Sequence, residues 1–207
     1  MKIKRFVLGM YQENCYLVWH DQTKKGFLVD PGTYSEAIMD FIKENNIELE
    51  CIVLTHAHGD HIGGLERFMS EFNAPVYIHE KEAPILKDAN KNESLGIVGY
   101  KIEIDADRLL KDGEELEIGG IPIKILHTPG HTPGGMCIYV GSYLISGDTL
   151  FAESIGRTDF RYSSTDDLIN AVKNKLYLLP DDTIVLPGHG LETSIGHEKK
   201  RNPFVRP

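Results

Sequence analysis

Residues 51–64, CIVLTHAHGDHIGG, join a short apolar run to a loop that carries three histidines and an aspartate within six residues. The run CIVL has the length and the β-branched content of a buried strand. The loop after it contains the small residues Ala57 and Gly59, which let a chain fold tightly and bring several side chains to one point. The stretch therefore predicts a strand of a buried sheet that ends in a polar site.

The segments around this stretch alternate between strand-like and helix-like patterns. Apolar residues recur at helical spacing in residues 35–45, 62–72 and 166–178, and short β-type runs lie between and around them. This alternation predicts an α/β fold. No Ser-rich or Pro-rich linker divides the chain, so we expect one domain over residues 1–207. The polar, glycine-containing residues 88–107 are expected to form either a lid over a site or a solvated connector.

Composition limits the classes of partner. The 207 residues are 41% hydrophobic and 26% charged, with a net charge of −9. A chain of this length can bury a sizeable core, and an acidic chain is a poor ligand for nucleic acid. The sequence contains no apolar run of 18 residues and no signal-peptide pattern, so no membrane span is expected. Three widely spaced cysteines argue against a disulfide framework and favour a cytoplasmic location.

Three further segments repeat the design of an apolar run that ends in a glycine turn with a polar residue. They are ILHTPGHTPGG (125–135) with His127 and His131, LISGDTLF (144–151) with Asp148, and IVLPGHG (184–190) with His189. Imidazoles and carboxylates that converge on one point are typical ligands of Zn²⁺, Mn²⁺ or Fe²⁺. His127 is a candidate for steadying a ligand from outside. His20, His79 and His197 lack this context, and we expect them to be structural.

Taken in order, THAHGDHIGG, HTPGHTPGG, SGDTLF and PGHG resemble the motif series of the metallo-β-lactamase superfamily. The resemblance implies a four-layer αβ/βα sandwich with the site at one edge of two facing sheets. It implies a first metal ion held by His56, His58 and His131. It implies a second ion held by Asp60, His61 and His189, with Asp148 bridging the two. VDPG (29–32) also resembles the family, in which the aspartate that matches Asp30 supports the site from behind.

Within the superfamily, GRTDF (156–160) and the tail ETSIGHEKKRNPF (192–204) are similar to short bacterial members of the glyoxalase II group, the hydroxyacylglutathione hydrolases. The chain ends at Pro207, without the long C-terminal helical extension of full-length glyoxalase II. True β-lactamases are disfavoured for two reasons. They are exported, whereas this sequence shows no signal-peptide pattern, and they have no aspartate that matches Asp148. Arg157 is expected either to hold a substrate carboxylate or to pair with Asp159.

The resemblance implies a reaction as well as a fold. Two divalent ions, zinc by first choice and iron or manganese as alternatives, would activate a shared water near neutral pH. The resulting hydroxide would attack a small-molecule thioester such as S-lactoylglutathione, with Asp60 orienting it and Asp148 as the second catalytic carboxylate. A thiolate leaving group needs little protonation, so no strong general acid is required.

Three alternatives stay open at the level of sequence. Persulfide dioxygenases share the fold and a GRTDF-like segment, and they hold one Fe²⁺ through residues that match His56, His131 and Asp148. Against them, they tend to show Ala-His-Asp-Tyr near the last histidine, where this chain has PGHG. A lactonase or another metallohydrolase is the second alternative, and a non-catalytic metal-binding module is the third. The acyl group, the thiol and the oligomeric state are left open.

Overall fold

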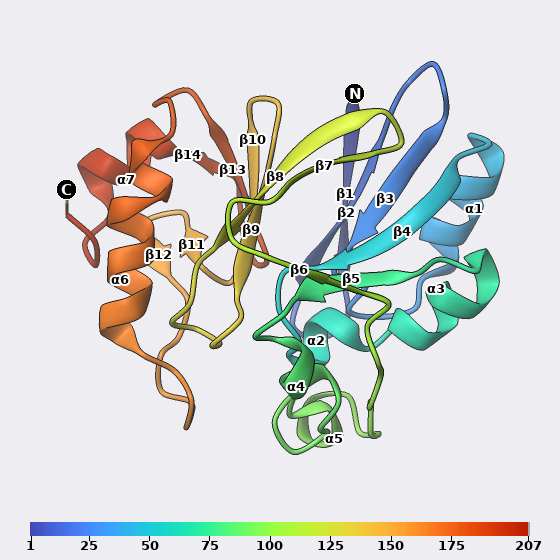
Figure 1. Ribbon diagram of the computed structural model, residues 1–207, viewed down its shortest axis with the longest axis horizontal. Helices are drawn as coiled ribbons and strands as arrows, with labels where there is room; N and C mark the ends of the chain where they lie inside the picture. The colour runs from blue at the N-terminus through green and yellow to red at the C-terminus, as the bar shows by residue number, and fades with distance from the viewer. Residues whose placement is uncertain (207) are drawn as a thin grey trace.

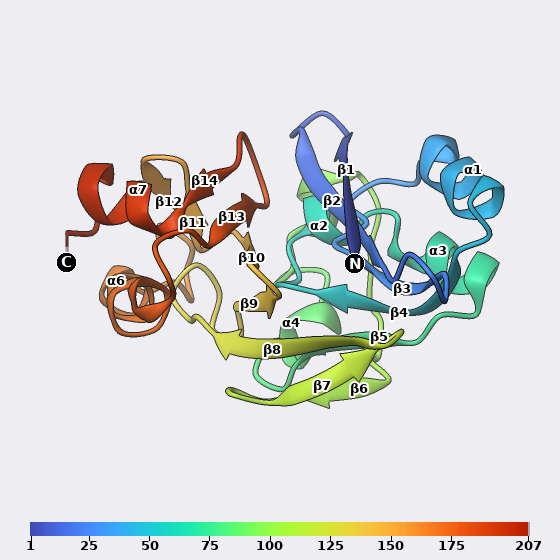
Figure 2. The ribbon, with the colours of Figure 1, turned by 90° about the horizontal axis from the view of Figure 1, so that it is seen from above.

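The computed structural model describes residues 1–206 and consists of two facing β-sheets with helices on their outer faces (Figures 1 and 2). Each sheet has six strands. One cluster of buried apolar side chains fills the space between the sheets, and two more lie between each sheet and its helices. The layers therefore run helix, sheet, sheet, helix, which is the expected α/β four-layer sandwich.

The first sheet is formed by the N-terminal half of the chain and has the strand order β1-β2-β3-β4-β5-β6. Its strands are β1 (Lys2–Leu8), β2 (Glu13–Trp19), β3 (Lys25–Val29), β4 (Glu48–Leu54), β5 (Val76–His79) and β6 (Arg108–Leu110). The first three are antiparallel, and β3 to β6 are parallel to one another. Because β3 and β4 are parallel neighbours, Asp30 after β3 and the histidine loop after β4 lie at the same sheet edge.

The second sheet has the order β14-β13-β10-β9-β8-β7. Its strands are β7 (Glu115–Ile118), β8 (Ile121–His127), β9 (Met136–Val140), β10 (Tyr143–Gly147), β13 (Ile184–Pro187) and β14 (Thr193–Ser194), and a separate ribbon pairs β11 (Leu150–Phe151) with β12 (Ser154–Ile155). Strands β10 and β13 are parallel, with Gly147 opposite Pro187. Asp148 and His189 therefore emerge side by side from adjacent strand ends.

The helices divide into outer layers and short turns at the sheet edge. The outer helices are α1 (Glu36–Glu44) and α3 (Leu65–Phe72) on the first sheet, and α6 (Thr165–Asn174), the 3₁₀ turn η1 (Leu176–Leu178) and α7 (Ile195–Arg201) on the second. The short helices α2 (Gly59–Ile62), α4 (Ala83–Leu86) and α5 (Ser94–Ile97) gather below the sheets in Figure 1. Within residues 1–206, no helix has the length and apolar character that crossing a membrane requires.

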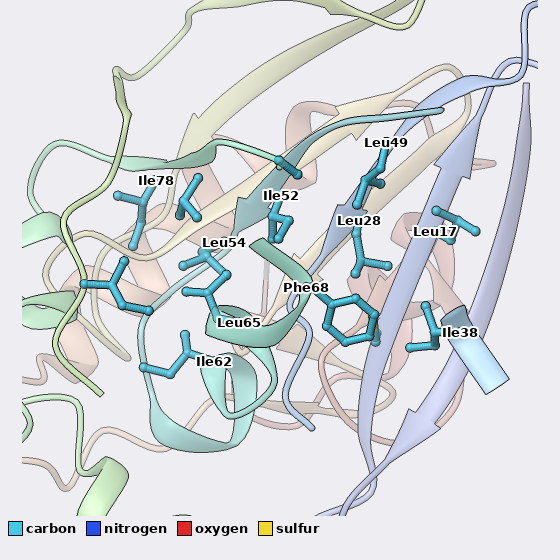
Figure 3. Close-up of a cluster of buried hydrophobic side chains, with 14 of the residues drawn as sticks. Leu17, Leu28, Ile38, Leu49, Ile52, Leu54, Ile62, Leu65, Phe68 and Ile78 are labelled. Atoms are coloured by element: carbon cyan, nitrogen blue, oxygen red, sulfur yellow. The ribbon is translucent and has the colours of Figure 1, made fainter. Parts of the chain in front are cut away.

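A cluster of buried apolar side chains packs helices α1 and α3 onto the first sheet. Side chains from β2, β3 and β4 meet those of the two helices in one buried cluster, in which Leu28, Ile52 and Phe68 are each 0% exposed (Figure 3). Burial of each such side chain stabilises the fold by about 1.5–3 kcal/mol. The loop that carries the histidines leaves directly from β4, one of the strands packed in this cluster.

Two expected helices are divided in the structure. The helix expected over residues 62–72 begins at Leu65, because a separate helical turn, α2, ends at Ile62 and two glycines follow it. A Cβ on Gly64 would lie 2.6 Å from backbone atoms of Thr33 and Tyr34, so this close packing requires glycine there. The helix expected over residues 166–178 begins at Thr165, and its last residues form the 3₁₀ turn. Ser164 caps it by accepting a hydrogen bond from the Asp167 amide.

Residues 88–107 are not a solvated connector. They contain helix α5, and Ile102 and Ile104 pack into the core of the first sheet. The buried Asn92 accepts a hydrogen bond from the Gly59 amide at 2.8 Å through its backbone carbonyl. The segment is therefore attached to the first residue of α2, the helix that carries Asp60 and His61.

Candidate metal centre

Polar side chains that follow strands β3, β4, β8, β10 and β13 converge at the edge where the two sheets meet. Their donor atoms form three groups that could each hold a metal ion, with all donor atoms of a group within 4.8 Å of one another. The groups are His56, His58 and His131; Asp60, His61 and His189; and Asp30, His56 and His61. The first two groups are the ligand sets that the sequence resemblance implied for the first and the second ion.

Asp148 lies between the first two groups. Its Oδ2 is 3.5 Å from His131 Nε2 and 3.8 Å from His189 Nε2, and its Oδ1 is 3.4 Å from His61 Nε2. The aspartate reaches this place because β10 ends at Gly147, where φ is +48° and a Cβ would clash with the Thr55 side chain. One carboxylate thus faces donor atoms of both groups, which is the arrangement that a bridging ligand needs.

The three histidines of the first group each have one ring nitrogen engaged by an acceptor. His131 Nδ1 donates to the Arg157 carbonyl at 2.8 Å. The Tyr162 hydroxyl donates to the Lys91 carbonyl, so its oxygen accepts from His58 Nε2 at 2.9 Å. Thr55 Oγ1 donates to Asp30, so it accepts from His56 Nδ1 at 3.1 Å. The nitrogens that remain for a metal ion are therefore His56 Nε2, His58 Nδ1 and His131 Nε2.

The two histidines of the second group are held in the same way, each through one ring nitrogen. His61 Nδ1 donates to Asp30 Oδ2 at 3.0 Å, and His189 Nδ1 donates to the Tyr11 carbonyl at 3.0 Å. Their Nε2 atoms lie 3.3 Å apart, and His189 Nε2 is 3.4 Å from Asp60 Oδ2. All five histidines thus present one nitrogen to the centre and hold the other on the protein.

The charge states of the first group and of Asp148 suit metal ligands. Burial lowers the pKa of His56 and His131 and lowers that of His58 to about 3, so these rings are neutral at pH 7. Burial opposes charge on Asp148, but the neighbouring His61 outweighs it and holds the pKa of Asp148 well below the usual range. Burial lowers the pKa of His61 and His189, but Asp148 beside His61 and Asp60 beside His189 outweigh it and raise both pKa values. Because neutral imidazole and ionised carboxylate are the forms that bind divalent metals, an ion in the second group would displace a proton from each of these two rings.

Two unpaired atoms point to the same conclusion. His56 Nε2 and Asp148 Oδ1 are buried and have no hydrogen-bond partner among residues 1–206. A buried polar atom without a partner is costly, by about 1–3 kcal/mol. A divalent ion would use these two atoms as ligands, so the donor set fits a metal centre and explains an arrangement that is otherwise unfavourable.

Asp30, the residue that the resemblance implied as a support, is hydrogen-bonded to His61 of the second group. Its Oδ1 accepts the Thr55 amide at 2.8 Å, and its Oδ2 accepts from Thr55 Oγ1 and His61 Nδ1. Asp30 has a left-handed backbone conformation, with φ of +49°, and is 1% exposed. It thereby joins the loop after β3 to the first residue after β4.

Two other predicted residues lie outside the ligand groups. His127 stacks on His79 with ring centroids 4.1 Å apart and pairs through Nε2 with the Pro133 carbonyl, so it contacts the loop that carries His131 and not a ligand ring. The exposed guanidinium of Arg157 forms two 3.0 Å hydrogen bonds with Asp159, the second of the two expected arrangements. Arg157 contributes its backbone carbonyl to His131.

Sequence reasoning missed two residues that hold the centre. Glu82 is 0% exposed and accepts the Ala57 amide at 3.0 Å and the Gly134 amide at 2.8 Å. It therefore ties the loop of His56 and His58 to the loop of His131. Tyr162, which accepts from His58, follows GRTDF by two residues in a segment without secondary-structure periodicity. Neither residue has a local pattern that sets it apart; each acts through the tertiary fold.

The comparisons with known proteins show the family. Residues 8–189 match the metallo-beta-lactamase superfamily model, and the chain belongs to that superfamily. A probable metallo-hydrolase, YqgX of Bacillus subtilis, is 39% identical over 99% of this chain and 98% of its own. The hydroxyacylglutathione hydrolase GloC of Haemophilus influenzae is 33% identical over 99% of this chain and 98% of its own.

Solved structures carry the same fold. BLEG-1, described as a B3 metallo-beta-lactamase, superposes with a TM-score of 0.92 at 40% identity, over 99% of both chains. TTHA1623, described in a di-iron-bound form, gives 0.84 at 32% identity over 98% of this chain and all of its own. ETHE1 of Myxococcus xanthus gives 0.84 at 26% identity over 98% of this chain and 84% of its own.

Proposed function

We propose that this chain is a dinuclear metallohydrolase that cleaves thioesters, with S-lactoylglutathione as the model substrate. His56, His58 and His131 would hold one ion, Asp60, His61 and His189 the other, and Asp148 both. The observation that carries the proposal is that five histidines each have one nitrogen engaged by the protein and the other directed at a common centre. The name of the GloC relative supports the thioester as the bond that is cleaved.

The ions, when bound, would supply Lewis acidity and make hydroxide available from water near neutral pH. The protein's own part is to orient. The Asp60 carboxylate is partly exposed, at 16%, and lies 3.4 Å from His189 Nε2, so it is placed to accept a hydrogen bond from the attacking water. The released thiolate needs little protonation, so the site needs no strong general acid.

Zinc is our first choice of metal, because four- and five-ligand sets of imidazole and carboxylate suit it, and iron and manganese fit the same donors. The di-iron form of TTHA1623 supports iron as an alternative metal. The substrate is expected to be a small molecule, and a cytoplasmic location stays a prediction of the cysteine pattern.

The dioxygenase alternative needs one iron held by His56, His131 and Asp148. The likeness to ETHE1 at 26% identity keeps this alternative open to test. The complete second group of Asp60, His61 and His189 favours the hydrolase, because a mononuclear site leaves that group without a role.

A panel of substrates on protein loaded separately with Zn²⁺, Fe²⁺ and Mn²⁺ tests the proposal. We expect thiol release from S-lactoylglutathione and no oxygen uptake with glutathione persulfide. Oxygen uptake by the iron form without thioester cleavage would establish the dioxygenase instead. A lactone and a β-lactam belong in the panel, the latter because BLEG-1 is described as a B3 metallo-beta-lactamase. Turnover of either one in place of the thioester would replace the proposed substrate class.

A further inference from the structure

A cavity of about 320 Å³ opens beside Asp60, on the side of the centre formed by the second ligand group. This volume is at the lower end of the range for small-molecule sites. Its wall is largely apolar, with side chains from the turn between β1 and β2 on one side and from the end of α5 on the other. The apolar lining residues are Leu8, Met10, Tyr11, Ile97, Val98 and Tyr100.

Both walls are tied to the candidate metal ligands. The Tyr11 carbonyl accepts from His189 Nδ1 at 3.0 Å, so the β1–β2 turn is attached to that histidine. On the other side the Tyr100 hydroxyl donates to the Gly63 carbonyl, directly after α2. A Cβ on Gly63 would lie 3.1 Å from Val98, so α2 and the wall after α5 are in close contact. The cavity therefore has a defined position relative to Asp60.

Exposed apolar side chains gather at this cavity. Met10 is 90% exposed, Tyr11 51% and Tyr100 50%, although large apolar side chains are usually buried. Grouped exposed apolar residues on a soluble chain commonly mark a binding site. The wall has two acidic residues. Both carboxyl oxygens of Glu13 are buried, and Asp60 is a member of the second ligand group.

We propose that this cavity receives the acyl half of the substrate and selects apolar acyl groups larger than acetyl. The inference rests on the proposed thioester hydrolysis and adds the class of acyl group. Among the described residues the wall contains no lysine or arginine, so it offers no cation to the carboxylates of an anionic thiol such as glutathione. A second cavity, of about 840 Å³, includes Tyr162, the partner of His58. Its lining has three basic side chains and two acidic ones, namely Lys81, Lys91, Arg161, Asp88 and Glu93. Its charge suits the anionic thiol half, which leaves the apolar cavity for the acyl group.

Glutathione thioesters that share the thiol and differ in the acyl group test the selectivity. Each methylene that becomes buried raises kcat/KM by about fourfold, so S-(3-methylbutanoyl)glutathione should exceed S-acetylglutathione by at least tenfold. In the double variant Met10→Ala/Val98→Ala this ratio should fall at least threefold. The matched control Leu178→Ala, which removes a 78% exposed leucine outside the cavity, should keep the wild-type ratio. A wild-type ratio near one, or an unchanged ratio in the double variant, would overturn the proposal.

A binding measurement separates this proposal from the proposed function. In protein labelled with ¹³C at the methionine methyl groups, 3-methylbutanoate should shift the Met10 signal, assigned through Met10→Ala, and acetate should not. The buried Met39 serves as internal reference. A Met10 shift in a protein that cleaves no thioester would retain the apolar site and reject the thioesterase. Thioester cleavage with no Met10 shift would retain the thioesterase and reject the cavity as acyl site.

Discussion

Removal of Glu82 tests whether one buried carboxylate holds both ligand loops. The variant Glu82→Ala leaves the amides of Ala57 and Gly134 without their acceptor in a fully buried place. Each unsatisfied buried donor costs about 1–3 kcal/mol. The two together predict a loss of about 2–6 kcal/mol in the free energy of unfolding under acidic conditions, where the carboxyl is uncharged.

The pH dependence gives this prediction its signature. Burial raises the pKa of Glu82 from 4.5 to about 7, even though the two amides favour the carboxylate. Between these values the folded protein keeps a proton that the unfolded chain has released, so wild-type stability falls as pH rises through this window. At about 1.4 kcal/mol per pKa unit, the contribution of Glu82 falls by about 2–3 kcal/mol between pH 5 and pH 8. The destabilisation of Glu82→Ala should therefore be larger at pH 5 than at pH 8.

Urea unfolding of wild type and variant in the presence of a chelator, at both pH values, measures this difference. Glu80→Ala, which removes an exposed carboxylate two residues away, is the matched control and should change stability by less than about 0.5 kcal/mol at either pH. Glu82→Gln, which retains one acceptor, should lie between wild type and Glu82→Ala at pH 5. A Glu82→Ala destabilisation that equals the control, or that grows with pH, would refute the reasoning.

Three other changes follow from the same geometry. Asp148→Ala should lose most of the bound metal and the turnover, because both ligand groups face this carboxylate; a fully active variant with both metals would remove the bridging role. His79→Ala, which removes the ring stacked on His127, should keep metal content within error of wild type by elemental analysis, and a loss of metal would assign His79 to the centre. Tyr162→Phe removes the acceptor of His58 and should weaken Co²⁺ affinity by about 10–100-fold in a spectroscopic titration; unchanged affinity would mean that His58 needs no partner.

The strands and the ligand motifs could be predicted from the sequence because their signals are local. The run 51–54 is apolar and β-branched, and the histidines follow it directly, so strand β4 and its polar end appear in one stretch. The division of the helix at Gly63 and Gly64 could not be predicted from apolar spacing. It depends on the close contact of Gly64 with the loop after β3, which only the folded chain brings near.

Supporting residues were harder to predict than ligands. The motif VDPG was enough to propose a supporting role for Asp30, but Glu82 and Tyr162 act through hydrogen bonds to loops 25 and 104 residues away in sequence. Residues 88–107 were ambiguous because they are polar in composition, and yet Ile102 and Ile104 are buried in the core. For Arg157 the sequence allowed two partners, and only the folded chain places its guanidinium on Asp159.

Anomalous diffraction at the zinc edge from crystals grown with Zn²⁺ is the most direct test of a dinuclear centre. We predict two peaks, the first in contact with His56, His58 and His131 and the second in contact with Asp60, His61 and His189, with Asp148 touching both. A single peak under saturating zinc, or a peak away from these residues, would contradict the dinuclear assignment on which the proposed hydrolysis depends.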